Sequence, residues 1–336
     1  MTTNGNGTKD GQYLVSAIVS VYNCERFIEG CLEDLENQTI ADKVEIVIVN
    51  SGSQQKEEII ISKFQDRYTN IVYLKTQERE TIYKAWNQGI KIAAGKYITN
   101  ANSDDRHRKD AFEIMVNVLE NNRDVDLVYA NSIVTNNENE SFDRHVPTKY
   151  VNRATPEPNA LSALLLKGCY VGPQPMWRKS IHKSIGLFNE SLDVVGDYEF
   201  WLRMSEKCKF QHINEYLGLY LNNQDSAEHR NPELSFEEWY QVVNNFLKKH
   251  VESKNDNIIF IKTVKAKLSE DTFYQGDFFF SKGKHNSAKR VLFRSIIYNW
   301  RNLKSYQLLL ACYLSPRMVI LLRSIKKGCK NIFFGK

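Results

Sequence analysis

The sequence lacks the patterns that would place the protein in or across a membrane. It has no run of 18 or more apolar residues, so we expect no transmembrane helix. Its first twelve residues, MTTNGNGTKDGQ, contain no apolar core of a signal peptide, and we expect residues 1–12 to be disordered. The six cysteines form neither a CxxC pair nor a Cys/His zinc pattern. We therefore predict a cytoplasmic protein with reduced thiols.

Acidic residues are missing from the end of the chain. None follows Asp277, whereas 13 Lys and Arg residues do. The whole chain of 336 residues has 45 Lys+Arg and 40 Asp+Glu, a net charge of +5. Residues 235–336 hold 19 basic and 7 acidic residues, a net of +12, which leaves −7 for residues 1–234. We expect a main domain over 13–234 and a basic helical region over 235–336.

Apolar, β-branched segments alternate with helical patterns in the first hundred residues. The composition, 42% apolar and 25% charged, is that of a globular protein, which argues against a disordered, collagenous or coiled-coil chain. Strand–helix alternation predicts a parallel sheet with helices on both faces, with ligands at the carboxyl ends of the strands. The predicted strands are 14–22, 44–50, 71–75 and 96–101, and the predicted helices are 25–38, about 55–67 and 81–94.

The second half of the chain has a different pattern. Residues 135–160 are polar and contain prolines, which predicts a long surface connection. From Ser235 the pattern is almost wholly helical, with a turn at Gly283-Lys284. The spacing within 270–298 suits one tetratricopeptide-like pair, but a single repeat is weak evidence and we prefer an ordinary helical hairpin.

Two acidic motifs follow predicted elements of the main domain. Asn102-Ser103-Asp104-Asp105 comes directly after a strand, where it suits either a divalent cation bound through carboxylates or the N-cap of a following helix. Gly196-Asp197 begins the aromatic segment GDYEFWLR. Asp197 is there either a helix-capping residue or an ionised carboxylate that acts as a general base.

The order of these motifs resembles that of the family 2 glycosyltransferases. The resemblance covers about residues 14–225 and rests on five motifs in sequence. It implies a GT-A fold, with a mixed, mainly parallel sheet flanked by helices and followed here by a C-terminal helical extension. It also implies an inverting, metal-dependent enzyme that uses a nucleotide-activated sugar. The motifs are Val21-Tyr22-Asn23, EIVIVNSGS (45–53), IYKAWNQGIKIAAG (82–95), YITNANSDD (97–105) and GDYEFWLR (196–203).

By this resemblance, Asp104 and Asp105 bind Mn²⁺ or Mg²⁺, and Asp104 also contacts the donor diphosphate. Asp197 matches the catalytic base of the family. A UDP-sugar is the donor that we consider first, and a hexose is the group transferred. The residues that match the nucleotide-binding positions are Tyr22, Asn23, Asn50, Ser51, Asn87, Asn102 and Asp104. Asn23 is equally suited to a turn that ends a strand, and Asn87 to a surface position.

The match has three departures. Asn50 stands where many members have an aspartate that contacts the base, so the identity of the base is open. Asn102 replaces a frequent aspartate, and Gly196 replaces a glutamate. Weaker hypotheses concern Glu78–Glu80 and Tyr83 near the donor sugar and Gln174 facing the acceptor or forming a turn. His229 is placed near the metal or diphosphate, or is simply solvated.

The basic C-terminal region suits two arrangements. Apolar faces beside Arg323, Lys326 and Lys327 fit an interfacial helix on an anionic membrane, and they equally fit a helix packed on the catalytic domain. Nucleic acid is not expected, because no reading motif accompanies the charge. Membrane contact would place the protein on the inner face of the membrane.

The sequence as a whole predicts transfer of a sugar from a nucleotide-sugar to a hydroxyl of a glycan or lipid-linked acceptor, in surface polysaccharide or glycoconjugate synthesis. The alternative is a non-catalytic GT-A scaffold that binds partners through its C-terminal helices. A sugar-nucleotide pyrophosphorylase would need a Gly-rich basic loop after the first strand, which VYNCER (21–26) does not provide. Oligomeric state is not predicted.

Overall fold

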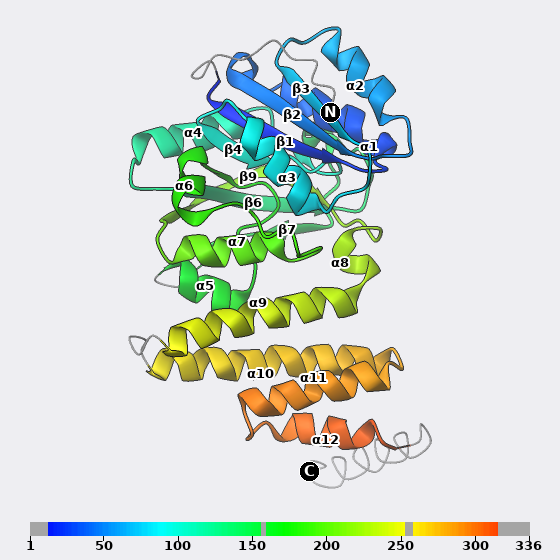
Figure 1. Ribbon diagram of the computed structural model, residues 1–336, viewed down its shortest axis with the longest axis vertical. Helices are drawn as coiled ribbons and strands as arrows, with labels where there is room; N and C mark the ends of the chain where they lie inside the picture. Colours follow the sequence, from blue (N-terminus) through cyan, green and yellow to red (C-terminus); the bar gives the residue numbers. More distant parts are fainter. Residues whose placement is uncertain (1–12, 156–158, 253–257, 315–336) are drawn as a thin grey trace, which may run out of the picture. The chain divides into compact units, whose positions relative to one another are not determined.

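The computed structural model describes residues 13–155, 159–252 and 258–314 (Figure 1). The chain divides into two compact units, Met1–Val242 and Val243–Lys336. Residues 1–12, which we expected to be disordered, lie outside the described residues. The domain boundary expected after residue 234 stays a prediction, because compactness alone does not define a domain.

One sheet forms the centre of the first unit (Figure 1). Its strands are β1 (Val15–Val21), β2 (Val44–Ser51), β3 (Ile71–Thr76), β4 (Tyr97–Asn100), β5 (Arg106–His107), β6 (Leu127–Thr135), β7 (Lys149–Val151), β8 (Met176–Arg178) and β9 (Phe210–Leu221). Their order is β3-β2-β1-β4-β8-β6-β9-β5, with β7 beside β6. The strands β1 to β4, β6 and β9 run the same way, whereas β5, β7 and β8 run against their neighbours. The sheet is mixed and mainly parallel, as expected.

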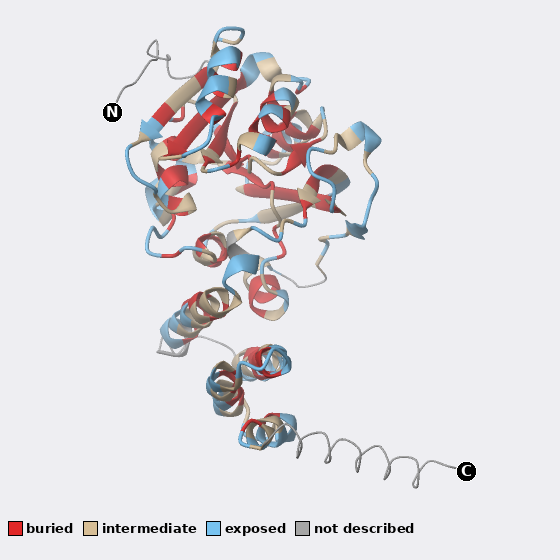
Figure 2. Ribbon diagram, turned by 90° about the vertical axis from the view of Figure 1, so that its right-hand side faces the viewer, coloured by how far each residue is buried: buried red, intermediate tan, exposed pale blue. Residues whose placement is uncertain are grey.

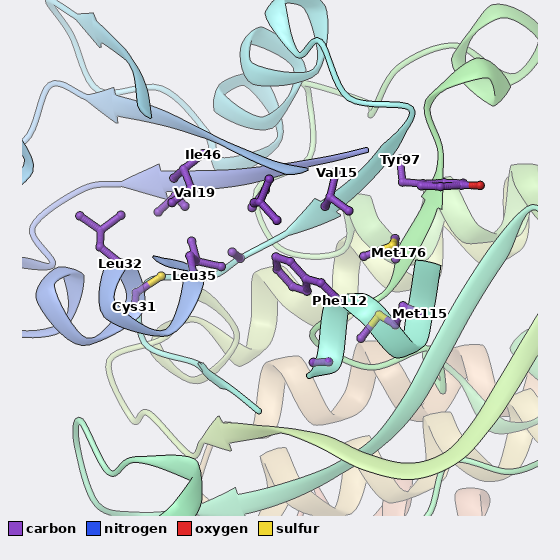
Figure 3. Packing of buried hydrophobic residues seen from close by; sticks show 14 of the residues in the cluster. Val15, Val19, Cys31, Leu32, Leu35, Ile46, Tyr97, Phe112, Met115 and Met176 are labelled. Carbon is purple, nitrogen blue, oxygen red and sulfur yellow. The ribbon is translucent and has the colours of Figure 1, made fainter. Parts of the chain in front are cut away.

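Helices cover both faces of this sheet. They are α1 (Glu25–Glu36), α2 (Glu57–Gln65), α3 (Ile82–Ile92), α4 (Ala111–Asn121), α5 (Ala160–Lys167), α6 (His182–Ile185), α7 (Gly196–Ser205) and α8 (Ala227–Arg230), and α9 (Pro232–Glu252) begins in the same unit. Val19 and Ile46 of the strands share one apolar core with Leu32 of α1 and Phe112 of α4 (Figure 3). Burial on both faces explains the continuous apolar strands, which Figure 2 shows as buried.

The opposite face of the sheet is covered by α3 and an aromatic cluster. Gly89 lets α3 approach closely, because a Cβ there would lie 2.6 Å from Ile18 Cγ2. The rings of Phe188 and Phe200 have centroids 4.2 Å apart. Trp177 of β8 and Trp201 of α7 make an edge contact at 5.4 Å. These large buried rings fix α7 against the sheet.

The second unit is helical, as expected, with α10 (Ile258–Ser281), α11 (His285–Tyr298) and α12 (Leu303–Ala311). The helices α10 and α11 form a hairpin that turns at Gly283, whose φ is +74°. A Cβ at Gly276 would lie 2.7 Å from Leu292, so glycine permits close helix packing there. Residues 315–336, including the predicted interfacial segment around Arg323, lie outside the described residues.

No helix within the described ranges is long and apolar enough to cross a bilayer. No disulfide joins the cysteines that the structure describes, which are Cys24, Cys31, Cys169, Cys208 and Cys312.

Candidate active site

The loops after β1 and β2 are bonded to each other. Asn23 has a φ of 50°, in the left-handed region that asparagine tolerates. Its Oδ1 accepts hydrogen bonds from Ser53 Oγ (3.2 Å) and from the Gln54 N–H (3.0 Å). Asn50 Oδ1 accepts the Ser53 N–H at 2.9 Å. Two of the residues predicted for the nucleotide site thus shape the carboxyl edge of the sheet.

Asn50 and Ser51 both direct their side chains into the protein. Asn50 is 2% exposed, and its Nδ2 donates to the hydroxyl of Tyr73 at 3.0 Å. Ser51 Oγ accepts the Glu80 N–H at 2.6 Å and so holds the segment ahead of α3. Tyr22 is half-buried, and the guanidinium of Arg79 lies 4.4 Å from its ring centroid. A cation therefore covers the one aromatic ring at this edge that the sequence had assigned to the nucleotide.

The two carboxylates after β4 have different environments. Asp105 is 1% exposed and accepts hydrogen bonds from Asn102 Nδ2 and the Leu221 N–H, each at 3.2 Å. Burial, and then the charge of Asp104, raise the pKa of Asp105 well above its usual range. Asp104 is half-buried, and its Oδ2 accepts from Asn223 Nδ2 at 3.0 Å.

The alternative of a helix N-cap for this motif is wrong. The strand β5 follows Asp105 directly, and the next helix, α4, begins at Ala111 with Asp110 as its N-cap residue. The motif therefore lies in a turn between two strands of the sheet, so its buried carboxylate needs another explanation.

A divalent cation fits this turn if substrate supplies part of its coordination. Asp104 is only half-buried and can direct an oxygen toward a ligand, whereas Asp105 is enclosed and positions the turn. In the part of the chain that the structure describes, no three His, Cys, Asp or Glu side chains are grouped to hold a metal ion. Mg²⁺ is commonly bound by one or two carboxylates together with substrate phosphates and water. The carboxylates of this turn suit an ion that is also coordinated by substrate phosphates and water, and they do not suit an ion coordinated by protein groups alone.

Asp197 lies in the first turn of α7, where N–H groups without helical partners favour a carboxylate. It is not the N-cap residue, which is Val195. The Tyr198 N–H donates to Asp197 Oδ1 at 2.7 Å, and the Tyr83 hydroxyl lies 3.4 Å from the same oxygen. Burial, with the charge of Asp197, raises the pKa of Tyr83 well above its usual value, so Tyr83 stays a neutral donor. Asp197 is half-buried.

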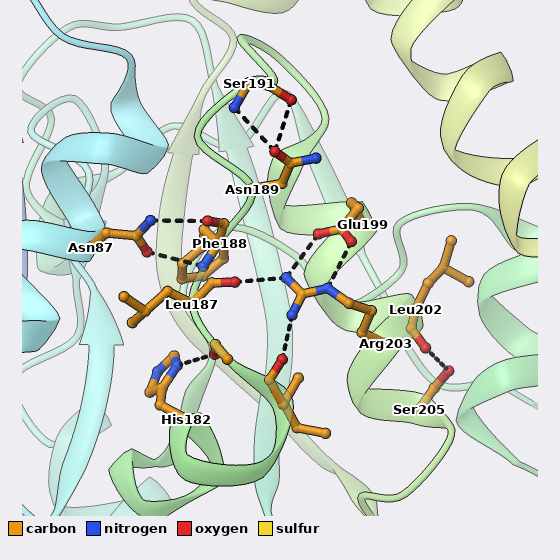
Figure 4. Close-up of polar contacts among 12 residues, drawn as sticks. Asn87, His182, Leu187, Phe188, Asn189, Ser191, Glu199, Leu202, Arg203 and Ser205 are labelled. Atoms are coloured by element: carbon orange, nitrogen blue, oxygen red, sulfur yellow. Dashed lines mark hydrogen bonds and ion pairs between the residues drawn. The ribbon is translucent and has the colours of Figure 1, made fainter.

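The segment ahead of α7 is bonded to α3 through Asn87 (Figure 4). Asn87 is 1% exposed. Its Oδ1 accepts the Phe188 N–H and its Nδ2 donates to the Phe188 carbonyl, both at 2.9 Å. The same Nδ2 donates to Glu190 Oε1 at 2.9 Å. Asn87 thus joins the helix of the third motif to the segment that leads to Asp197.

Two residues that no sequence pattern identified lie near the carboxylates. Cys169 is exposed, and its Sγ lies 3.9 Å from Asp197 Oδ2. Arg153 donates to Ser132 Oγ from Nε (3.1 Å) and from a terminal nitrogen (3.0 Å). Burial lowers the pKa of Arg153, which the charges of Cys169 and Asp105 oppose. The hydrogen bonds of Arg153 hold its guanidinium on Ser132, within electrostatic range of Asp105 and Cys169.

Gln174 and His229, for which the sequence gave weaker hypotheses, lie in different environments. Gln174 is 8% exposed and donates to the Arg106 carbonyl at 3.1 Å, beside Gly218. His229 Nδ1 lies 2.8 Å from the carbonyl oxygen of Asn223, the residue that donates to Asp104. His229 therefore contacts Asn223, which in turn contacts Asp104, one of the two carboxylates after β4.

The fold and these motifs agree with the comparisons with known proteins. The model of glycosyl transferase family 2 matches residues 16–186, half of the chain. The chain therefore belongs to this family. An uncharacterised glycosyltransferase of Methanocaldococcus jannaschii is 27% identical over 216 residues, which cover 63% of this chain and 72% of that protein. Chondroitin synthase of Pasteurella multocida is 26% identical over 70% of this chain, which spans only 23% of the synthase.

Solved structures show the same GT-A fold. S. aureus TarS, residues 1–349, matches with a TM-score of 0.61 at 16% identity, covering 91% of each chain. The same TarS fragment in complex with UDP-GlcNAc matches with a TM-score of 0.57 at 18% identity. A mannosyltransferase of Pyrobaculum calidifontis in complex with GDP-Man and Mn²⁺ matches with a TM-score of 0.56 at 13% identity, covering 100% of this chain and 85% of that one.

Proposed function

We propose that this glycosyltransferase is an inverting hexosyltransferase that acts on a nucleotide-sugar, with a UDP-sugar as the first candidate, and on a hydroxyl of a glycan or lipid-linked acceptor. The observation that carries the proposal is Asp197, held in the first turn of α7 beside a neutral Tyr83 hydroxyl. The relatives that synthesise chondroitin, and the structural neighbours bound to UDP-GlcNAc or GDP-Man, support a role in polysaccharide or glycoconjugate synthesis.

In this mechanism Asp197 accepts the proton of the acceptor hydroxyl as that oxygen bonds to the anomeric carbon. The bond from this carbon to the diphosphate oxygen breaks at the same time, and its electron pair leaves with the nucleoside diphosphate. Attack from the face opposite the leaving group inverts the anomeric configuration, so no second carboxylate nucleophile is needed. Asp104 would hold a Mn²⁺ or Mg²⁺ ion in the turn that Asp105 belongs to, and such an ion would neutralise charge on the leaving diphosphate.

A donor screen with Mn²⁺ tests this function. Release of nucleoside diphosphate is measured for wild type, Asp197→Asn and the control Asp66→Asn, whose side chain is exposed and lies outside the site. We expect acceptor-dependent transfer in wild type and in the control, and a loss of at least 100-fold in Asp197→Asn. Transfer by Asp197→Asn at the wild-type rate would show that the base is another residue. If wild type neither binds nor turns over any donor, the non-catalytic scaffold becomes the better interpretation.

An anionic membrane surface is the partner that we propose for the second unit, on the inner face of the cytoplasmic membrane. Between Phe278 and Leu314 there is no acidic residue, and several apolar side chains are exposed. Trp300 is 68% exposed and Leu303 70%. Basic and aromatic groups exposed together suit the headgroup region of anionic lipids. The basic residues in this stretch are Lys282, Lys284, Lys289, Arg290, Arg294, Arg301 and Lys304.

A further inference from the structure

The helix that carries Asp197 begins without a side-chain cap of its own. Its N-cap residue is Val195, which has no side-chain oxygen to offer the N–H groups of the first turn. The side chain of the preceding Asp193 is exposed. The short segment 193–195, which sets where α7 starts, therefore depends on bonds from elsewhere in the chain.

A carboxylate of another helix supplies these bonds. Glu238 of α9 is 6% exposed. Its Oε1 accepts the Asp193 N–H at 2.8 Å, and its Oε2 accepts the N–H groups of Val194 and Val195 at 2.9 and 3.2 Å. Three N–H bonds to a single buried carboxylate fix the segment more firmly than a neutral cap would.

The other side of the same segment is held by Tyr83 of α3. Its hydroxyl donates to the Val194 carbonyl at 2.6 Å and lies 3.4 Å from Asp197 Oδ1. The peptide groups of 193–195 are thus bonded on one side by Glu238 and on the other by Tyr83. Asp197 follows two residues later, so its carboxylate has little freedom to shift.

We propose that Glu238 is a positioning residue for the transfer reaction, which fixes the base Asp197 through segment 193–195. The role rests on the proposed function, in which Asp197 deprotonates the acceptor. A shift of about 1 Å in a catalytic group can lower the rate by about 100-fold. Loss of the three bonds should therefore lower kcat and leave KM for the donor unchanged, because the proposed donor site is at the carboxyl ends of β1, β2 and β4.

The test compares wild type, Glu238→Gln and the control Glu270→Gln, which removes an exposed carboxylate from α10. Hydrogen–deuterium exchange is followed in peptides that cover 189–197, and the stoichiometry of UDP binding with Mn²⁺ counts the folded sites. In Glu238→Gln we expect about 10-fold faster exchange confined to 193–195, an unchanged stoichiometry, and kcat lower by about 10- to 100-fold at constant donor KM. The control should match wild type.

Three results would overturn the proposal. Unchanged exchange at 193–195 would show that Glu238 does not hold the segment, whatever the activity. Faster local exchange with kcat within 2-fold of wild type would show that the segment does not position Asp197. Faster exchange throughout the chain would show that Glu238 stabilises the whole fold and has no role confined to segment 193–195. If no donor is turned over by wild type, the proposed function fails separately, and exchange still decides whether Glu238 holds the segment.

Discussion

The ring of Tyr83 occupies the space that a side chain at position 196 would need. A Cβ on Gly196 would lie 2.6 Å from Cδ2 and 2.7 Å from Cε2 of this ring. The family resemblance implies a glutamate at this position in one form of the motif, and this chain has glycine. The packing of Tyr83 explains the departure, because the ring bonded to the segment ahead of Asp197 leaves room for glycine alone.

Gly196→Ala should therefore destabilise the protein, although alanine normally stabilises a helix by about 1 kcal/mol relative to glycine. We expect a loss of about 1 to 3 kcal/mol in the free energy of unfolding, from overpacking against the ring. Urea unfolding of wild type, Gly196→Ala, Tyr83→Leu and the double variant measures it. The alanine should cost less in the Tyr83→Leu background, and an equal cost in both backgrounds would rule out this contact as the cause.

Alkylation of Cys169 should block transfer, because its exposed thiol lies 3.9 Å from Asp197 Oδ2. N-ethylmaleimide would place a bulky group where the acceptor hydroxyl must approach. We expect at least a 10-fold loss of transfer in wild type, with binding of nucleoside diphosphate retained. Cys169→Ser should keep most of its activity and resist the reagent. Equal inactivation of Cys169→Ser would assign the effect to another cysteine.

Glu36 should make stability depend on pH. Burial raises its pKa from 4.5 to about 7, an effect that a hydrogen bond from Asn70 partly opposes. The folded state therefore binds more protons than the unfolded state between these values, so stability falls as the pH rises from about 4.5 to about 7.

Glu36→Gln should remove this dependence. We expect a gain on the order of 1 kcal/mol at pH 8, which is about 2–4 °C in Tm, and no gain at pH 4. Glu33→Gln, on the exposed side of the same helix, is the control. Thermal unfolding from pH 4 to pH 8 measures both. The same gain at both pH values would show that the charge of Glu36 is not the cause.

Replacing two exposed apolar residues of the second unit should weaken membrane binding. Flotation with liposomes containing phosphatidylglycerol compares the full chain with Trp300→Ser/Leu303→Ser. Tyr150→Ser, which removes an aromatic residue that is 54% exposed in the first unit, is the control. We expect lower recovery for the double variant alone, and lower recovery of wild type at high salt. Equal recovery of all three proteins would argue against this surface.

The four parallel strands β1 to β4 could be predicted from the sequence, whereas the other strands of the sheet were not. The run LVSAIVSVY predicted a strand over 14–22, and β1 spans Val15–Val21. Strands buried on both faces are continuous apolar runs, so β2 and β4 were also evident. The strand β7, of three residues, lies within the connection 135–160 and has no periodicity that could reveal it. Short strands of this kind are defined by their partners.

The candidate site could be predicted in part. Asp104, Asp105 and Asp197 were identified because a family motif fixes each of them locally. Cys169 and Glu238 could not be found in this way. Cys169 contacts Asp197 across 28 residues of sequence, and Glu238 bonds to segment 193–195 across 43 to 45. Contacts of this kind depend on tertiary packing, so no local pattern in the sequence reveals them.

The bonds of Asn87 also bear on how the products leave. They join α3 to the segment ahead of α7 in a buried setting, so this wall of the site should stay closed throughout turnover. The turn that carries Asn223 and Asp225 is held mostly by exposed bonds, such as the one from Arg26 to Asp225 at 3.2 Å. We therefore expect the spent nucleotide to depart on the side of Asn223, with release of Asp104 as the opening event.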